Sequence, residues 1–442
     1  MKNVDLIISG GRVLTLDETG SYYEDGSVAV VADRIVAVGT KSDIESTHNA
    51  TRVIDGRDCI IMPGLINGHT HAAMTCFRGM ADDLKLEDWL NRYIFPAEAK
   101  NVDLELAYWG SMLACAEMIK SGTTTFCDMY IFEDETAKAA AQSGMRCLIG
   151  EVLFDFPSPN VKTFQEGLNY TERLIEKWTG HPLVNIMVEP HALYTCSPEL
   201  LKNAKALADR YQKQIGLHFL ETKFEKESLK QKYEMNATSY LKKIDYLDDR
   251  LIAFHGVWMS EEDIRDFADH GSSIVHNPES NMKLASGVAP VPDMLIQGAR
   301  VALGTDGCAS NNNLDLFLEM DTAAKLHKVH RLDPTVMDSR TVVRMATCEG
   351  AKALGMGGIT GSLQPGMKAD IILIDLKKPH LTPLYNEYSL LVYTVKGDDV
   401  KTVLIDGRIV MEDRKLLTID EQDVMERVRR ISFRIRESLG MA

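Results

Sequence analysis

Two histidines stand one residue apart in the segment GLINGHTHAAM, residues 64–74, directly after an apolar run. Alternate residues of a β-strand point to the same side. His69 and His71 would therefore direct their imidazoles at one point if the strand extends through them. Two converging imidazoles favour a metal site, whereas one histidine at a turn and one in solvent is the ordinary alternative. The segment alone leaves both interpretations open.

Further side chains of the same chemical kind follow other apolar runs. His218 and Glu221 lie in QIGLHFLET, His255 lies in LIAFHG, and Asp306 lies in RVALGTDGCASNN. A single histidine such as His218 is more often part of a core than a ligand. Four imidazoles and a carboxylate at the ends of separate strands make a metal site the better interpretation. Nitrogen and oxygen ligands without thiolate suit zinc or iron, and an open coordination position would let the metal activate water as a nucleophile.

The elements that must position these residues can be read from the pattern between residues 60 and 305. Apolar, strand-like runs alternate there with helical segments such as DLELAYWGSMLACAEMIKSG, whose end at Gly122 is typical of a helix C-terminus. The predicted strands are 60–66, 123–128, 145–153, 183–189, 214–220, 251–256, 272–276 and 300–305. This order predicts an α/β fold, a (β/α)₈ TIM barrel, in which chemistry gathers at the carboxyl ends of the strands.

Both ends of the chain have a different pattern. Short alternating strands with Gly, Asp and Asn turns occupy the first 60 residues and return in MKADIILIDL and VKTVLIDGRIVMED. We expect residues 1–60 and 365–420 to form a small composite β-sandwich domain, with the metal-dependent barrel spanning 61–364. A charged amphipathic helix is predicted over 421–442.

Composition excludes several classes of partner. The chain has 442 residues and a formal net charge of −15, from 49 Lys and Arg against 64 Asp and Glu. Such a balance predicts no nucleic-acid partner and no membrane partner. The eight cysteines are scattered with no C-x-x-C pair, and no apolar run approaches the length of a membrane span. Free thiols and the lack of a signal-like N-terminus predict a cytoplasmic location.

The motifs PGLINGHTH, HFLET, FHG, HNPESNMKLASGVAPV and LGTDGCASNNNLDLFLEM together resemble the amidohydrolase superfamily. Within it they are similar to the deaminases that act on 5′-methylthioadenosine and S-adenosylhomocysteine. The resemblance implies hydrolytic deamination of an adenosine-type nucleoside to the inosine analogue plus ammonia by a metal-activated hydroxide. It also implies that a single divalent ion, zinc or alternatively iron, is bound by His69, His71, His218 and Asp306, and that Asp306 accepts a proton from water.

The same resemblance implies roles for five further residues. Glu221 would carry a proton to the purine ring, and His255 would orient the attacking hydroxide. Glu98, in YIFPAEAK, would hold the ribose hydroxyls, for which a carboxylate is a suitable acceptor. His191, in EPHALYTCS, would be a second nucleoside contact, and Trp89 an aromatic wall. The structural alternatives are that Glu98 caps a helix, His191 holds its own loop, and Trp89 belongs to the core.

Two absences refine this hypothesis. The fourth predicted strand, PLVNIMVEP, has no lysine to bridge a second metal, which predicts one ion per chain. The segment CLIGEVLFDFPSPN has no arginine where S-adenosylhomocysteine deaminases usually carry one. Methylthioadenosine, adenosine or 5′-deoxyadenosine would then be better substrates than S-adenosylhomocysteine.

Other functions remain open at this level. A guanine-type deaminase or an s-triazine hydrolase would use the same metal site, and Glu98 is the residue that discriminates between them and a nucleoside enzyme. A catalytically inactive scaffold protein is disfavoured because every candidate ligand and Glu221 are present. Relatives of this kind often associate, which predicts a homo-oligomer.

Overall fold

Both ends of the chain contribute to one nine-stranded β-sheet in the computed structural model, which describes residues 1–441. The order is β18-β17-β16-β15-β5-β1-β2-β3, with β4 paired to β1. Its strands are β1 (Lys2–Leu14), β2 (Tyr22–Val31), β3 (Arg34–Thr40), β4 (His48–Asp55), β5 (Cys59–Pro63), β15 (Ile371–Asp375), β16 (Val400–Ile405), β17 (Arg408–Glu412) and β18 (Lys415–Leu416). Antiparallel pairing of β15 with β5 joins the two ends, and this confirms the predicted composite β-sandwich unit.

A two-residue turn shows why the terminal sequence folds this way. Ile405 pairs with Arg408, so Asp406 and Gly407 alone connect β16 to β17. Both have positive φ, 51° and 76°, as the tight hairpin turn favoured by an Asp-Gly pair requires. A Cβ at Gly407 would also lie 2.0 Å from the carbonyl oxygen of Ala32. Glycine is therefore required at this position.

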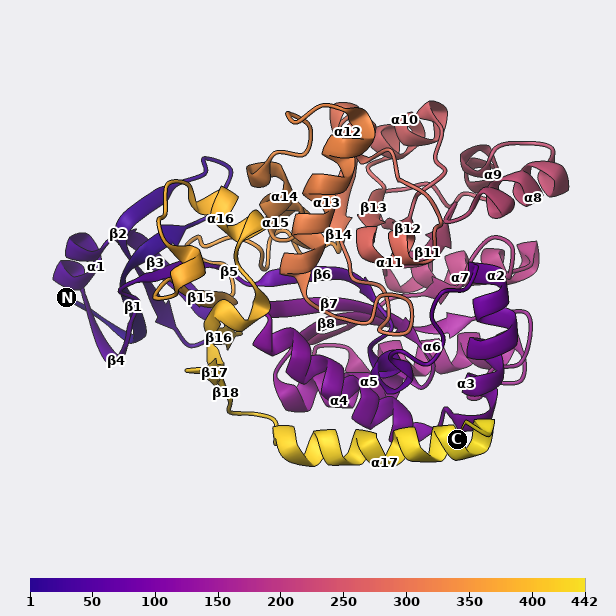
Figure 1. The fold of residues 1–442 in the computed structure, drawn as a ribbon, viewed down its shortest axis with the longest axis horizontal. Helices are drawn as coiled ribbons and strands as arrows, with labels where there is room; N and C mark the ends of the chain where they lie inside the picture. The colour runs from indigo at the N-terminus through magenta and orange to yellow at the C-terminus, as the bar shows by residue number, and fades with distance from the viewer. Residues whose placement is uncertain (442) are drawn as a thin grey trace.

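The middle of the chain forms a barrel of parallel strands wrapped by helices (Figure 1). Its strands are β6 (Leu65–Thr70), β7 (Thr123–Tyr130), β8 (Arg146–Leu153), β9 (Val184–Ile186), β10 (Glu189–Pro190), β11 (Ile215–Phe219), β12 (Leu251–His255), β13 (Ser273–His276) and β14 (Arg300–Leu303). The helices that follow them are α4 (Leu104–Lys120), α5 (Glu133–Ser143), α6 (Phe164–Trp178), α7 (Pro198–Tyr211), α8 (Lys223–Tyr233), α9 (Ala237–Lys243), α10 (Glu261–His270), α11 (Pro278–Lys283), α12 (Val291–Ile296), α13 (Leu316–Arg331), α14 (Ser339–Met345) and α15 (Cys348–Ala353). The predicted TIM-barrel architecture is confirmed.

Backbone contacts close the barrel at both seams between its two sheets. At one seam Val188 bridges Ile215 and Ala192 bridges His218. At the other the amide of Asp306 donates to the carbonyl of His69 over 2.9 Å. The second contact places the end of β14 directly beside the end of β6, although more than 200 residues separate them in the sequence.

The first predicted barrel strand, 60–66, was wrong in its bounds. Residues 59–63 belong to β5 of the terminal sheet, and the barrel strand β6 begins only at Leu65. The chain passes between the two at Gly64, where a Cβ would lie 2.1 Å from the side chain of Thr124. One continuous apolar run therefore serves two sheets. The predicted strand 183–189 is also divided, into β9 and β10.

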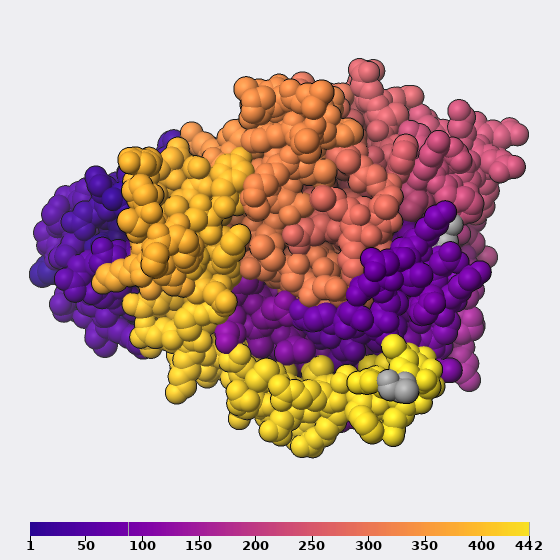
Figure 2. Space-filling model, viewed as in Figure 1, coloured from indigo at the N-terminus to yellow at the C-terminus, as the bar shows by residue number. Residues whose placement is uncertain are grey.

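The remaining helices connect the two parts of the molecule or cover the barrel. They are α1 (Lys41–Thr47), α2 (Leu86–Asp88), α3 (Phe95–Asn101), α16 (Glu387–Tyr393) and α17 (Glu421–Leu439), with short turns of other helical types at Ala72–Phe77, Trp89–Ile94, Pro379–Leu381 and Gly397–Asp399. The C-terminal helix α17 begins where it was predicted, ends at Leu439, and runs along the barrel beneath α4 and α3 (Figure 1). Figure 2 shows the rest of the C-terminal segment packed between the N-terminal strands and the barrel.

A buried ion pair ties the barrel to the terminal sheet. The guanidinium of Arg146, on β8, donates to both carboxylate oxygens of Asp370, at 2.9 and 3.1 Å, and to Asp406 at 3.1 Å. The pKa of Arg146 is raised, because these carboxylates outweigh the burial that opposes its charge. The domain boundaries near residues 60 and 365 stay a prediction.

Two expectations about the chain as a whole can be compared with the structure. All eight cysteines are buried and free. Over residues 1–441, no helix combines the length and the apolar character needed to cross a bilayer.

Candidate metal centre and active site

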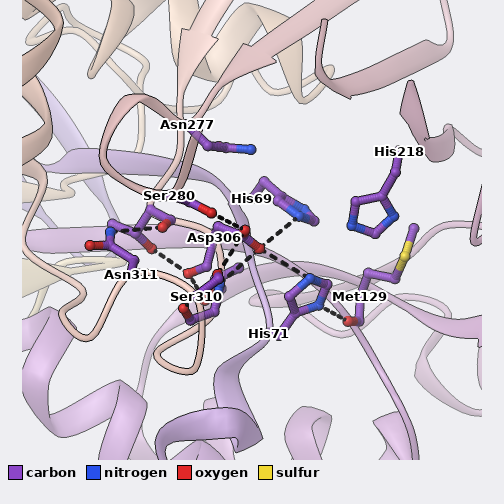
Figure 3. Close-up of polar contacts among 12 residues, drawn as sticks. His69, His71, Met129, His218, Asn277, Ser280, Asp306, Ser310 and Asn311 are labelled. Atoms are coloured by element: carbon purple, nitrogen blue, oxygen red, sulfur yellow. Dashed lines mark hydrogen bonds and ion pairs between the residues drawn. The ribbon is translucent and has the colours of Figure 1, made fainter. Parts of the chain in front are cut away.

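The two histidines of β6 converge as the strand geometry predicts. The ring centroids of His69 and His71 lie 4.8 Å apart. Their Nε2 atoms lie 3.5 and 3.1 Å from the same oxygen of Asp306 (Figure 3). Asp306 follows β14, so the barrel seam brings this carboxylate to the histidines.

His218 and His255 complete the cluster from β11 and β12. Their rings lie 5.0 and 5.7 Å from the ring of His69. Two sets of side chains could hold a metal ion, with ligand atoms within 4.8 Å of one another: His69 with His218 and His255, and His69 with His71 and Asp306. Three of the predicted ligands, His69, His71 and Asp306, form one set. The fourth, His218, belongs to the other set with His69 and His255. His69 is common to both.

The burial and the unpaired ring nitrogens of His69 are those expected of a metal ligand. Its side chain is fully buried, and within the described part of the chain neither ring nitrogen makes a hydrogen bond. Buried polar atoms without partners are rare because they lose hydration without compensation. Burial also lowers the pKa of His69 to about 3, so the imidazole is neutral and keeps the lone pair that a cation requires. Phe254 stacks on the ring at 3.9 Å and fixes its orientation.

Three of the other imidazoles are oriented through their Nδ1 atoms. His71 Nδ1 contacts the carbonyl of Met129 (Figure 3), and His218 Nδ1 lies 2.9 Å from the carbonyl of His191. Because a carbonyl only accepts, each Nδ1 must donate, which leaves Nε2 of a neutral ring free to bind a metal. His255 Nδ1 lies 2.9 Å from Oδ1 of Asn281.

Hydrogen bonds also hold Asp306 in place. Its Oδ2 accepts from Ser280 at 2.6 Å and from Ser310 at 2.8 Å, and its Oδ1 accepts from the amide of Gly307 (Figure 3). Burial opposes ionisation here, but the contacts with His69 and His71 hold the pKa of Asp306 well below its usual range. The carboxylate is therefore charged. The two serines were missed in the sequence, although both lie within the quoted motifs HNPESNMKLASGVAPV and LGTDGCASNNNLDLFLEM.

Glu221 lies at the edge of this cluster, just after β11. Its Oε2 is 3.9 Å from His255 Nε2, and its Oε1 accepts from Ser286 at 3.4 Å. Burial raises the pKa of Glu221. A carboxyl group of this kind can carry a proton at a pH where an exposed glutamate has lost it.

A cavity opens onto the cluster. All the predicted site residues except His69, which lies behind its wall, line it: Trp89, Glu98, His191, His71, His218, Glu221, His255 and Asp306. Glu98 is buried and accepts a hydrogen bond of 2.7 Å from Tyr130, and burial raises its pKa to about 7. No side chain caps the start of α3, so the helix-cap alternative for Glu98 is not what the structure shows. Tyr130 was not anticipated from the sequence.

For His191 and Trp89, the structure shows the structural role named as the alternative as well as a place in the cavity wall. His191 Nδ1 lies 2.8 Å from the hydroxyl of Thr195, four residues on, so this histidine does hold its own loop. Trp89 packs in the hydrophobic cluster that surrounds the cavity, and its indole nitrogen has no partner among the described residues. Both side chains line the cavity in addition.

Comparison with known proteins identifies the family. The model of the amidohydrolase family matches residues 60–410. This chain belongs to the amidohydrolase family. The match includes the whole barrel and the C-terminal strands β15, β16 and β17 up to residue 410.

Individual relatives of this amidohydrolase match over nearly the whole chain. A 5-methylthioadenosine/S-adenosylhomocysteine deaminase 1 of Syntrophus aciditrophicus is 64% identical over 439 residues, 99% of each chain. A 5′-deoxyadenosine deaminase of Methanosarcina mazei is 46% identical over 96% of each chain. The crystal structure of an adenosine deaminase from Xanthomonas campestris with bound zinc superposes with a TM-score of 0.97 at 37% identity, covering 99% of each chain.

Proposed function

We propose that this amidohydrolase deaminates adenosine-type nucleosides hydrolytically, releasing ammonia and the corresponding inosine analogue. The observation that carries the proposal is one cavity with the histidine cluster at one part of its wall and the buried Glu98 at another. The three relatives named above are all described as deaminases of adenosine or of its 5′ derivatives, which supports the same substrate class.

We propose one divalent cation per chain, zinc, held by His69, His71, His218 and Asp306. Three imidazoles and a carboxylate suit zinc, and the similar Xanthomonas structure contains it. A cation there supplies Lewis acidity, which makes water nucleophilic near neutral pH.

The chain's own residues then manage the protons. Water adds to the purine carbon that bears the amino group, and Asp306, which is ionised, accepts the proton that the water loses. Glu221 in its protonated form donates to the adjacent ring nitrogen. His255, held by Asn281, orients the water. Asp306 then returns its proton to the amino group, and the carbon–nitrogen bond breaks as the added hydroxyl becomes the carbonyl and gives its proton to Glu221, which releases ammonia.

The other cavity residues bind the nucleoside. The Glu98 carboxylate accepts hydrogen bonds from both ribose hydroxyls, with Tyr130 holding it in position. His191, through its Nε2, is a second contact, and Trp89 packs against the substrate as an aromatic wall. Guanine and s-triazines lack a vicinal diol, so a buried acidic side chain facing the cavity favours a nucleoside over either of them.

A panel of substrates tests the proposal directly. The purified, zinc-loaded protein is incubated with adenosine, 5′-deoxyadenosine, methylthioadenosine, guanine and an s-triazine, while ultraviolet absorbance and ammonia release are followed. We expect the absorbance shift of the inosine product and one ammonia per nucleoside, with no turnover of guanine or triazine. Turnover of guanine or triazine alone would replace the proposal with that alternative. A zinc-loaded protein inert toward all of them would be a scaffold.

A further inference from the structure

The part of the cavity beside Glu98 is apolar and aromatic. Phe95 lies one helical turn before Glu98 on α3, where residues three apart are neighbours on the helix surface, and both line the cavity. Phe154, just after β8, also lines it, with its ring centroid 6.2 Å from that of Phe95 in an edge-to-face arrangement. Leu90 and Ile131 extend the same wall.

This wall leads from the metal cluster to the surface. The ring centroids of His218 and His191 are 4.7 Å apart, those of His191 and Phe154 are 4.8 Å apart, and Phe154 stacks on Phe156 at 4.5 Å. Phe156 is 40% exposed, whereas Phe154 is 8% exposed. The succession runs outward, and of these two phenylalanines Phe154 lines the cavity while Phe156 lies nearer to solvent.

The cavity offers no lysine or arginine to a carboxylate among the described residues that line it. Three acidic side chains line it, Glu98, Glu221 and Asp306, and its histidines other than His191 belong to the metal cluster. Asp155, between Phe154 and Phe156 in the sequence, is exposed and adds negative charge at this end. A carboxylate placed here would lose hydration and gain no opposite charge.

The proposed function places the base at the cluster and the ribose diol at Glu98. Phe95 neighbours Glu98 on α3, and Phe154 packs against Phe95, so these two rings are the ones we assign to the 5′ group. We propose that this aromatic wall selects an uncharged, apolar 5′ substituent, such as methylthio, over the zwitterionic homocysteine tail of S-adenosylhomocysteine. The inference rests on the proposed function and names the preferred substrate class within it.

A substrate series separates charge from length. Adenosine, methylthioadenosine, 5′-deoxy-5′-(propylthio)adenosine and S-adenosylhomocysteine are compared by kcat/KM, because the propylthio compound has the carbon chain of the homocysteine tail without its charges. We expect the propylthio compound to be turned over within about threefold of methylthioadenosine, and S-adenosylhomocysteine at least about tenfold less well than either. Equal or faster turnover of S-adenosylhomocysteine would overturn the inference and leave the deaminase proposal intact. Failure of all four substrates would overturn the proposed function itself.

Substitutions locate the effect on the wall. Phe95→Arg places a cation beside the 5′ group, and we expect the ratio of kcat/KM for S-adenosylhomocysteine to that for the propylthio compound to rise at least tenfold. Phe433→Arg is the matched control, because Phe433 is 61% exposed on α17 and does not line the cavity; its ratio should not change. Phe154→Leu gives a second test without a buried charge: methylthioadenosine should lose more kcat/KM than adenosine, whose 5′ hydroxyl gains little from the ring. Equal losses for both substrates, or an unchanged ratio in Phe95→Arg, would contradict a selective wall.

Discussion

Glu98→Gln tests how the cavity holds a nucleoside, because it keeps the size of the side chain and removes its charge. The carboxylate is buried and accepts one hydrogen bond, of 2.7 Å, from Tyr130. A hydrogen bond to a charged group contributes about 1.5–3 kcal/mol. If the substitution removes this free energy from the contact with the ribose diol, kcat/KM for adenosine falls by about 10- to 150-fold, because each 1.4 kcal/mol is about tenfold in rate.

The assay compares two substrates in two proteins. Wild type and Glu98→Gln are loaded with zinc to the same measured content, and deamination of adenosine and of 2′,3′-dideoxyadenosine is followed by absorbance. The substitution should reduce kcat/KM for adenosine by at least tenfold and for the dideoxy compound by less than about threefold. A smaller loss with adenosine, or equal losses with both substrates, would refute the diol contact.

The pH dependence gives an independent readout of the same residue. Burial raises the pKa of Glu98 to about 7, and only the ionised carboxylate can accept from both hydroxyls. Below pH 7 the ionised fraction falls about tenfold per pH unit, so kcat/KM for adenosine should fall in proportion. This limb of the profile should be absent in Glu98→Gln and for the dideoxy substrate in wild type. An identical acid limb in both proteins would assign the titration to another group.

Three further predictions concern the metal, the proton donor and the joint between the two parts of the fold. His69→Ala should lose bound metal and activity together, and wild type should contain one equivalent by elemental analysis; two tightly bound equivalents would contradict the single site. Glu221→Gln should retain its metal while kcat falls by about 10²- to 10⁴-fold, and a kcat within tenfold of wild type would remove Glu221 from proton transfer. Asp370→Asn should lower the free energy of unfolding in urea by about 3–5 kcal/mol, because it leaves the buried charge of Arg146 without its main partner. Asp55→Asn, at an exposed ion pair, is the control and should leave the stability almost unchanged; similar losses in both variants would show that burial of the Arg146 pair does not matter.

Several features of this protein could be predicted because they depend on local patterns. The alternation of a strand suffices to aim His69 and His71 at one point, and their rings do lie 4.8 Å apart. The regular order of strands and helices gave the barrel, and the carboxyl ends of its strands then gave the positions of His218, His255 and Asp306. Each of these inferences uses only a repeat of two residues or the direction of parallel strands.

Other features could not be predicted because they depend on which segments become neighbours. The apolar run 59–70 has one hydrophobic pattern but belongs to two sheets, and the close approach of Gly64 to Thr124 marks the change. Tyr130, which holds Glu98, is on a different element from its partner. Ser310 is four residues after Asp306 in the same loop, where no distinctive motif marks it, and Ser280 reaches Asp306 because β13 pairs with β14.

The sequence by itself determined the kinds of ligand available, their places at the ends of strands, and a barrel able to gather them. It also determined the absence of a lysine on the fourth strand and of an arginine in CLIGEVLFDFPSPN. Only the tertiary structure decided how these groups behave, because ionisation depends on the surroundings of a group in space. Burial in the folded barrel keeps His69 neutral and raises the pKa of Glu98 to about 7, while contact with His69 and His71 keeps Asp306 charged.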